Sequence, residues 1–161
     1  MIHPGISANG LMAIQICQQM NCRILVTASS EEKRNYLIEC CNILPDNIFD
    51  PDKANFVDQI LALTGGNGVD MVFDSMSIEK LITTFPIVSN YGRYIEIDNY
   101  ASSPNGQMRR NTHYYNISSL ISEDSFDTII PKLIKGFTKW FLESSSMYII
   151  YHLLSNFYTY L

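Results

Sequence analysis

The stretch HPGISANG, residues 3–10, combines two glycines and a serine immediately before a helical pattern. A turn that leads into a helix presents backbone N–H groups that bind the diphosphate of a nucleotide. Compared with the motif G-x-G-x-x-G, this turn keeps Gly5 and Gly10 but has Ser7 in place of the middle glycine, followed by Ala8. The middle glycine lets the backbone approach the phosphates closely, so Ser7 either crowds a diphosphate or hydrogen-bonds to it. An ordinary turn without a ligand explains the same residues.

A second polar cluster, TASSEEKR at residues 27–34, begins about 20 residues after the turn, where dinucleotide-binding proteins place the residue that contacts the ribose. Ser29 and Ser30 stand at the end of a predicted strand, and Lys33 and Arg34 follow one helical turn later. Hydroxyl groups and cations suit a ribose 2′-phosphate, which favours NADPH over NADH. The alternative is that these residues form only the solvated start of a helix.

The elements that would position these residues alternate along the chain. Short apolar runs predict strands, and apolar residues at helical spacing predict helices. The expected strands are 23–28, 47–49, 69–75 and 92–97, and the expected helices are 11–20, 29–41, 56–64, 77–88 and 125–137. This order indicates βαβ units, and therefore an α/β fold with a Rossmann-like, doubly wound parallel sheet. Residues 99–107 are expected to form a loop.

The strand that feeds the first turn is expected to be truncated. Only Met1 and Ile2 precede the turn, whereas a typical strand has about 5–6 residues. In the strand order 3-2-1-4-5-6 of this fold, the first strand is central. We therefore expect unpaired backbone groups on both of its neighbours.

Composition excludes several classes of protein. The chain has 161 residues, 47% of them hydrophobic and 17% charged, which is enough for one folded domain with a core. A net charge of −5 argues against a nucleic-acid partner. No signal peptide and no membrane span are expected. The four cysteines lack zinc spacing and are predicted to be free thiols in a reducing, cytoplasmic compartment. The three histidines are too scattered to predict a metal site.

In order and spacing, four motifs resemble the enoyl reductase domain of polyketide synthases and animal-type fatty acid synthases, within the medium-chain dehydrogenase/reductase superfamily. They are the first turn with AIQ, TASSEEKRNYL, TGGNGVDMVFDS and YGRYIEI. The resemblance runs from Ile2 to about Phe141. It implies a nucleotide-binding lobe over residues 1–141, NADPH as cofactor, and reduction of an α,β-unsaturated acyl thioester on an acyl carrier domain. Residues 142–161 are an unassigned apolar tail, expected to be a helix that is buried or covered by a partner.

The resemblance also implies where the cofactor would bind. By position, the residues that would line it are Gly5, Ser7, Ala8 and Gly10 at the diphosphate, Ser29, Ser30, Lys33 and Arg34 at the 2′-phosphate, Asp74 and Ser75 near the cofactor, and Ile97 and Asp98 near the nicotinamide. No catalytic residue is assigned. The family's candidate proton donors are a lysine, where this chain has Asn99, and an aspartate near Leu120, to which Asp124 aligns only with a gap.

Three hypotheses about function therefore remain. The chain is the NADPH-binding lobe of an enoyl reductase, present as a partial chain with little turnover of its own, because the substrate-binding lobe is missing. Alternatively, it is a non-catalytic nucleotide-binding or docking module whose apolar tail binds a partner. The third hypothesis is a different Rossmann enzyme, such as a methyltransferase. The cluster SSEEKR argues against this hypothesis, because a methyltransferase would be expected to have an acid at the end of the second strand.

Overall fold

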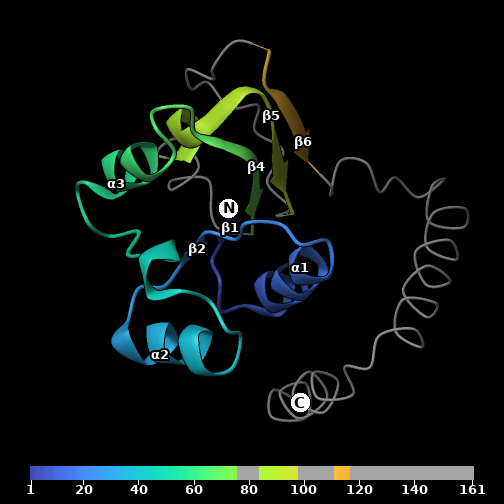
Figure 1. Cartoon of the computed structure of the whole chain (residues 1–161). Coiled ribbons are helices and arrows are strands. Elements are labelled where there is room, and N and C mark those ends of the chain that lie inside the picture. The colour runs from blue at the N-terminus through green and yellow to red at the C-terminus, as the bar shows by residue number, and fades with distance from the viewer. Residues whose placement is uncertain (76–83, 98–110, 117–161) are drawn as a thin grey trace, which may run out of the picture. The chain divides into compact units, whose positions relative to one another are not determined.

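A computed structural model describes residues 1–75, 84–97 and 111–116 of the chain (Figure 1). The chain divides into two compact units, Met1–Ser119 and Leu120–Leu161, and every described residue lies in the first. The expected helix 125–137, the loop 99–107, the tail 142–161 and the domain limit at residue 141 lie outside the described residues. So do the candidate residues Asp98, Asn99, Leu120 and Asp124.

A six-stranded sheet forms the centre of the first unit (Figure 1). The strand order is β3-β2-β1-β4-β5-β6, and every pair of neighbours is parallel. The strands are β1 (Ile2–His3), β2 (Val26–Thr27), β3 (Ile48–Phe49), β4 (Val69–Asp74), β5 (Val88–Glu96) and β6 (His113–Asn116). This is the order of a Rossmann sheet, so the predicted fold class is confirmed.

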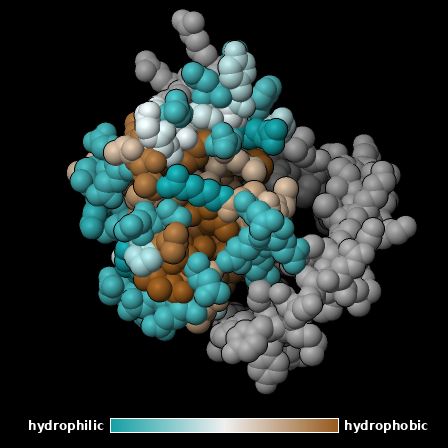
Figure 2. Space-filling view, viewed as in Figure 1, coloured by the Kyte–Doolittle hydropathy of each residue, from teal (hydrophilic) through white to brown (hydrophobic). Residues whose placement is uncertain are grey.

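Successive strand residues enter opposite faces of the sheet, and each face has its own hydrophobic cluster. Leu25 belongs to the cluster that contains Phe56 and Ile60 of α3 (Phe56–Leu63), whereas Val26 belongs to the cluster that contains Ile14 and Leu37. Because strand side chains alternate, helices must cover both faces. Figure 1 shows α1 and α2 close to each other and α3 apart from them. Figure 2 shows hydrophobic residues bordered by hydrophilic residues on one face of the molecule.

The short central strand β1 pairs with both of its neighbours. Ile2 N–H donates to Leu25 C=O at 2.8 Å, and Met1 C=O accepts from Phe73 N–H at 2.8 Å. His3 C=O accepts from Ser75 N–H at 2.9 Å. The expected truncation of the strand is therefore present, but the expectation of unpaired groups on both neighbours is wrong for the part of β2 and β4 that lies beside residues 1–3.

Side chains and glycines set the ends of the helices. Ser7 and Ser30 are the N-cap residues of α1 (Ala8–Gln19) and α2 (Glu31–Glu39), and their hydroxyls accept from Gly10 N–H and Lys33 N–H. Helix α3 stops before Gly65 and Gly66, whose φ angles of 60° and 79° are left-handed. These caps follow the usual residue preferences at helix ends.

Several boundaries differ from the predicted elements. The strand expected at 23–28 is limited to Val26–Thr27, and the helix expected at 11–20 begins at Ala8. Residues 77–83 of the helix expected over 77–88 lie outside the described residues. The helix expected over 77–88 is wrong at its end, because Phe85–Ile87 is a 3₁₀ helix and Val88 already begins β5. Pro86 has no N–H to continue an α-helical ladder, and Val88 pairs with Val69 of β4. The strand expected at 92–97 therefore starts at Val88 instead.

All four cysteines are free thiols, as predicted. Burial raises the pKa of Cys41 to about 11, so its thiol stays protonated at neutral pH. No helix in the described part of the chain has the length and hydropathy that crossing a bilayer requires.

Gly10 is the position in the first turn where a side chain fits least. A Cβ built there would lie 2.2 Å from Pro4 O and 2.7 Å from Gly5 O, both of them backbone atoms. We expect Gly10→Ala to lower the free energy of unfolding by about 2 kcal/mol or more, because backbone must move. The neighbouring exposed residue supplies the control: Asn9→Ala should stay within about 0.5 kcal/mol. Urea unfolding measures both, and equal stabilities of the two variants would contradict this packing.

Candidate functional site

Backbone hydrogen bonds link the carboxyl ends of the five strands β1–β5. Ala28 N–H donates to Phe49 O, Gly5 N–H to Thr27 O, Ser75 N–H to His3 O and Ile97 N–H to Asp74 O, at 2.9 to 3.0 Å. Ligands of doubly wound sheets bind beyond this edge. The structure therefore brings four sets of candidate residues to one edge of the sheet. They are the first turn, Ser29, Ser75 and Ile97.

In the first turn, Gly5 and Gly10 are required by packing. A Cβ on Gly5 would lie 3.0 Å from Thr27 O and 3.2 Å from Val26 Cβ, and Gly10 has even less space. Ser7 and Ala8, by contrast, are half-buried and exposed. Gly5 thus lets the turn lie against β2, Gly10 lets α1 begin against the backbone of the turn itself, and the chain has side chains at the two less buried positions between them.

Ser7 occupies the helix N-terminus with its own hydroxyl. Its Oγ accepts from Gly10 N–H at 2.9 Å and lies 3.5 Å from Pro4 O. Because the first N–H groups of a helix lack intrahelical partners, this cap removes one of the donors that a diphosphate would use. The N–H groups of Ala8 and Asn9 stand before Gly10 in the first turn of α1, and they are the donors that the cap leaves for an anion.

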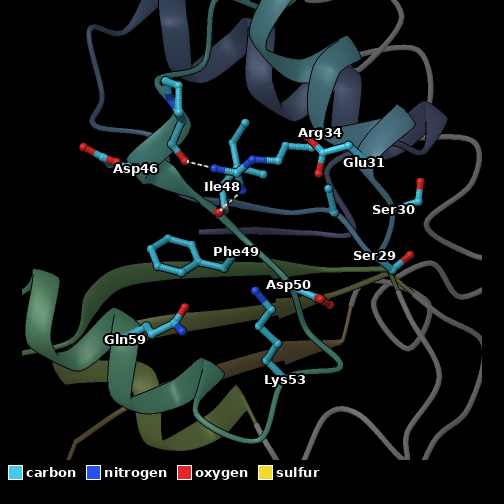
Figure 3. Close-up of a pocket in the computed structure, with 12 residues that line it drawn as sticks. Ser29, Ser30, Glu31, Arg34, Asp46, Ile48, Phe49, Asp50, Lys53 and Gln59 are labelled. Atoms are coloured by element: carbon cyan, nitrogen blue, oxygen red, sulfur yellow. Dashed lines mark hydrogen bonds between the residues drawn. The ribbon is translucent and has the colours of Figure 1, made fainter.

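A polar cavity of about 450 Å³ opens beside this turn, beyond the ends of β2 and β3 (Figure 3). Ser29, Ser30 and Arg34, three of the residues predicted at the 2′-phosphate, line it. Its other lining residues are Ala28, Glu31, Pro45, Asp46, Ile48, Phe49, Asp50, Lys53 and Gln59. Lys33, the fourth predicted residue, is exposed on α2 and does not line the cavity.

Arg34 forms one wall of the cavity and ties two elements together. Its guanidinium donates to Ile48 O at 2.8 Å and to Pro45 O at 2.7 Å, which connects α2 to the 3₁₀ helix Pro45–Asn47 and to β3. Sequence reasoning placed Arg34 correctly at the cavity but did not find this structural role. The carbonyls that orient Arg34 come from a segment 11 to 14 residues away.

Sequence reasoning missed Lys53. Lys53 lies in the connection between β3 and α3 and lines the cavity opposite Arg34 (Figure 3). Its local sequence, FDPDK after a two-residue strand, has no recognised spacing. Only the parallel pairing of β2 with β3 brings this connection beside Ser29.

Asp74, predicted near the cofactor, is fully buried at the end of β4. The Tyr94 hydroxyl donates to its carboxylate, and the Thr84 hydroxyl lies 2.8 Å from the Tyr94 oxygen. Burial and the adjacent Asp74 raise the pKa of Tyr94 well above its ordinary value, so the phenol remains a donor. The Asp74 side chain therefore belongs to the interior of the sheet edge, whereas Ser75, the next residue, is half-buried.

A second buried acid lies beside Asp74. Glu96 pairs in register with Asp74 across β4 and β5 and is also almost fully buried. The Tyr114 hydroxyl of β6 donates to the Glu96 carboxylate. Two tyrosine hydroxyls thus satisfy two buried acids at one end of the sheet, which buried carboxylates require.

Comparison with known proteins identifies the class. The sequence profile of the zinc-binding dehydrogenase family matches residues 8–104. Lovastatin diketide synthase lovF of Aspergillus terreus is 34% identical over 118 residues, which cover 73% of this chain and 5% of that protein. The chain thus spans about a twentieth of that relative's length.

Solved structures agree with the fold. The CurK enoyl reductase matches with a TM-score of 0.69 and 24% identity over 88% of this chain and 42% of that one. The nucleotide-binding subdomain of the enoylreductase domain of PpsC from Mycobacterium tuberculosis matches with a TM-score of 0.67 and 23% identity, covering 81% and 74% of the two chains.

The chain belongs to the zinc-binding dehydrogenase family, in the medium-chain dehydrogenase/reductase superfamily. Its fold is that of the nucleotide-binding subdomain of an enoylreductase domain, and the proteins to which it is similar include highly reducing polyketide synthases and a putative enoyl reductase domain of a polyketide synthase. Within the described ranges, no group of three or more His, Cys, Asp or Glu side chains could hold a metal ion, and we propose no zinc site.

The buried hydrogen bond between Tyr94 and Asp74 can be tested by deleting one hydroxyl. We expect Tyr94→Phe to lower the free energy of unfolding by about 2 kcal/mol, because a buried carboxylate loses a donor. Tyr91→Phe removes the same atom from a side chain that is 73% exposed and should change stability by less than about 0.5 kcal/mol. Thermal and urea unfolding compare the variants, and a Tyr94→Phe protein as stable as Tyr91→Phe would show that this bond contributes nothing.

Proposed function

We propose that this chain binds NADPH and serves as the cofactor lobe of an enoyl reductase that acts on α,β-unsaturated acyl thioesters. One observation carries the proposal: at the carboxyl edge of the sheet, a cavity lined by two serine hydroxyls, two cations and three carboxylates lies at the N-terminus of α2, and Gly5 of the glycine turn donates to Thr27 O, one residue before the cavity lining begins. A dinucleotide needs this combination, because its diphosphate and its adenosine bind at neighbouring positions of that edge.

The residues present fit the cofactor. Gly5 and Gly10 keep the turn close to β2, and the N–H groups at Ala8 and Asn9 would bind the diphosphate. The hydroxyls of Ser29 and Ser30, together with Arg34, line the cavity and would hold the phosphorylated ribose; Lys33, also predicted there, would have to reach it from outside the lining. Ser75 and Ile97, with Asp74 behind them and Asp98 next in sequence, would border the nicotinamide.

The bound cofactor would supply a hydride to the β-carbon of the acyl chain. The described residues of this chain bind and orient the cofactor, and we assign no proton donor among them. In this family the reaction takes place in the cleft between two lobes, so we propose that a substrate-binding lobe completes the site and that the acyl thioester arrives on an acyl carrier domain. The compartment proposed is the cytoplasm.

A non-catalytic nucleotide-binding or docking module is the second candidate. Two observations favour it: Ser7 caps α1 with its own hydroxyl, and the Asp74 carboxylate is turned into the sheet edge. Both reduce the number of polar groups that this edge has free to bind a cofactor. In this version the domain is still residues 1–141, and the apolar segment 142–161 binds a partner.

Cofactor titration tests the function directly. We expect NADPH to bind with higher affinity than NADH, measured by the change in nicotinamide fluorescence on addition of the full chain. No binding of either nucleotide at millimolar concentration would refute both candidates. Binding without reduction of a crotonyl thioester would favour the docking module, whereas turnover of that thioester would establish the reductase.

The Ser7 cap predicts the effect of a glycine in the turn. Ser7→Gly frees Gly10 N–H and removes a side chain from the diphosphate position, and N-cap glycine costs a helix only a few tenths of a kcal/mol. We expect NADPH affinity to rise about threefold with stability nearly unchanged. Ser30→Gly makes the same change at α2, at a residue that lines the cavity and would contact the ribose, and should lower affinity. An equal response of both variants would show that the first turn does not contact the diphosphate.

A further inference from the structure

We propose that Lys53 is the residue that distinguishes NADPH from NADH in this chain, because its ammonium holds the 2′-phosphate of the adenosine ribose from the β3–α3 connection. The inference rests on the proposed nucleotide function and deepens it. It replaces Lys33, which the sequence pattern selects, with a lysine from a different loop.

The backbone around Lys53 directs its side chain to the cavity. Asp50 C=O accepts from Lys53 N–H at 3.3 Å, and Lys53 C=O accepts from Phe56 N–H at 3.1 Å. The Asp50 carboxylate accepts from Asp52 N–H at 3.0 Å, which fixes the start of the same turn. Figure 3 shows the Lys53 side chain extending from this turn into the cavity, below Phe49.

The other two cations are less suited to the task. Two of the five N–H donors of Arg34 are used by Ile48 O and Pro45 O, which hold the guanidinium in place, so it can offer a ligand only the donors that remain in that fixed position. Lys33 lies outside the cavity lining. Among the described residues, Lys53 is the lysine that lines the cavity, and its ammonium makes no hydrogen bond or ion pair within the described part of the chain. Its three donors therefore remain for a phosphate.

Charge in the cavity makes this lysine decisive. The lining contains two cations, Arg34 and Lys53, and three carboxylates, Glu31, Asp46 and Asp50. Without Lys53, one positive charge would face three negative charges, and a ribose 2′-phosphate would be repelled. A carboxylate at this place would instead accept from the 2′-hydroxyl of NADH. Whether the chain prefers NADPH or NADH thus depends on whether the Lys53 ammonium reaches the ribose.

Two small probes isolate this contact in the full chain. Adenosine 2′,5′-bisphosphate carries the 2′-phosphate and adenosine 5′-monophosphate does not, and isothermal titration measures both affinities. We expect Lys53→Gln to weaken the bisphosphate about tenfold and to change the monophosphate less than twofold. Lys53→Arg should restore most of the loss. The exposed Arg23, which lies outside the cavity lining, supplies the matched control, and Arg23→Gln should leave both affinities unchanged.

The possible results distinguish a failure of the Lys53 assignment from a failure of the proposed nucleotide-binding function. If Lys33→Gln loses bisphosphate affinity while Lys53→Gln keeps it, the assignment to Lys53 is overturned and NADPH binding stands. If the unaltered chain binds both probes equally, the preference for a 2′-phosphate is absent and the inference fails, although nucleotide binding survives. If neither probe binds, the proposed function fails with it. Far-ultraviolet circular dichroism confirms that each variant is folded.

Discussion

The structure depends on the parallel pairing that joins the ends of β3, β2, β1, β4 and β5 into one edge. Four backbone hydrogen bonds, from Ala28, Gly5, Ser75 and Ile97, continue the sheet by one or two residues beyond its strands. They fix where each connecting segment leaves the sheet. The first turn, the serines after β2 and the residues after β4 and β5 can form one site only because of this alignment.

Close packing explains which glycines the first turn retains. Gly5 and Gly10 stand where a Cβ would meet backbone oxygen or the side chains of β2, so their loss would disturb the fold itself. Position 7 faces outward, and a serine there stabilises α1 through its cap. The turn thus has glycine at the two positions where the fold leaves no room for a side chain. The Ser7 hydroxyl that stabilises the helix occupies Gly10 N–H, which the proposed diphosphate would otherwise use.

Polar groups at the edge fall into two sets with different roles. Asp74 and Glu96 are buried, and tyrosine hydroxyls from β5 and β6 donate to them. Their bonds hold neighbouring strands in register at the place where the nicotinamide would lie. The cavity beyond β2 and β3 is open, and its cations and carboxylates face a space that a ligand can enter. The part of the edge beyond β2 and β3 therefore presents charged side chains to a ligand. The part formed by β4, β5 and β6 is held in place by buried hydrogen bonds.

The amino-acid sequence by itself determined the alternation of strands and helices, the serine caps at Ser7 and Ser30, the glycine stop after α3 and the family. These features depend on neighbours within a few residues, or on motifs in a fixed order, so they can be read along the chain. The tertiary structure alone decided that Met1–His3 suffice to pair β1 on both sides, that Arg34 ties α2 to β3, and that Lys53 faces Ser29 across a cavity. It also decided that Asp74 points into the sheet edge toward Tyr94. Each of these depends on the register of parallel strands, which brings together residues that are far apart in the sequence.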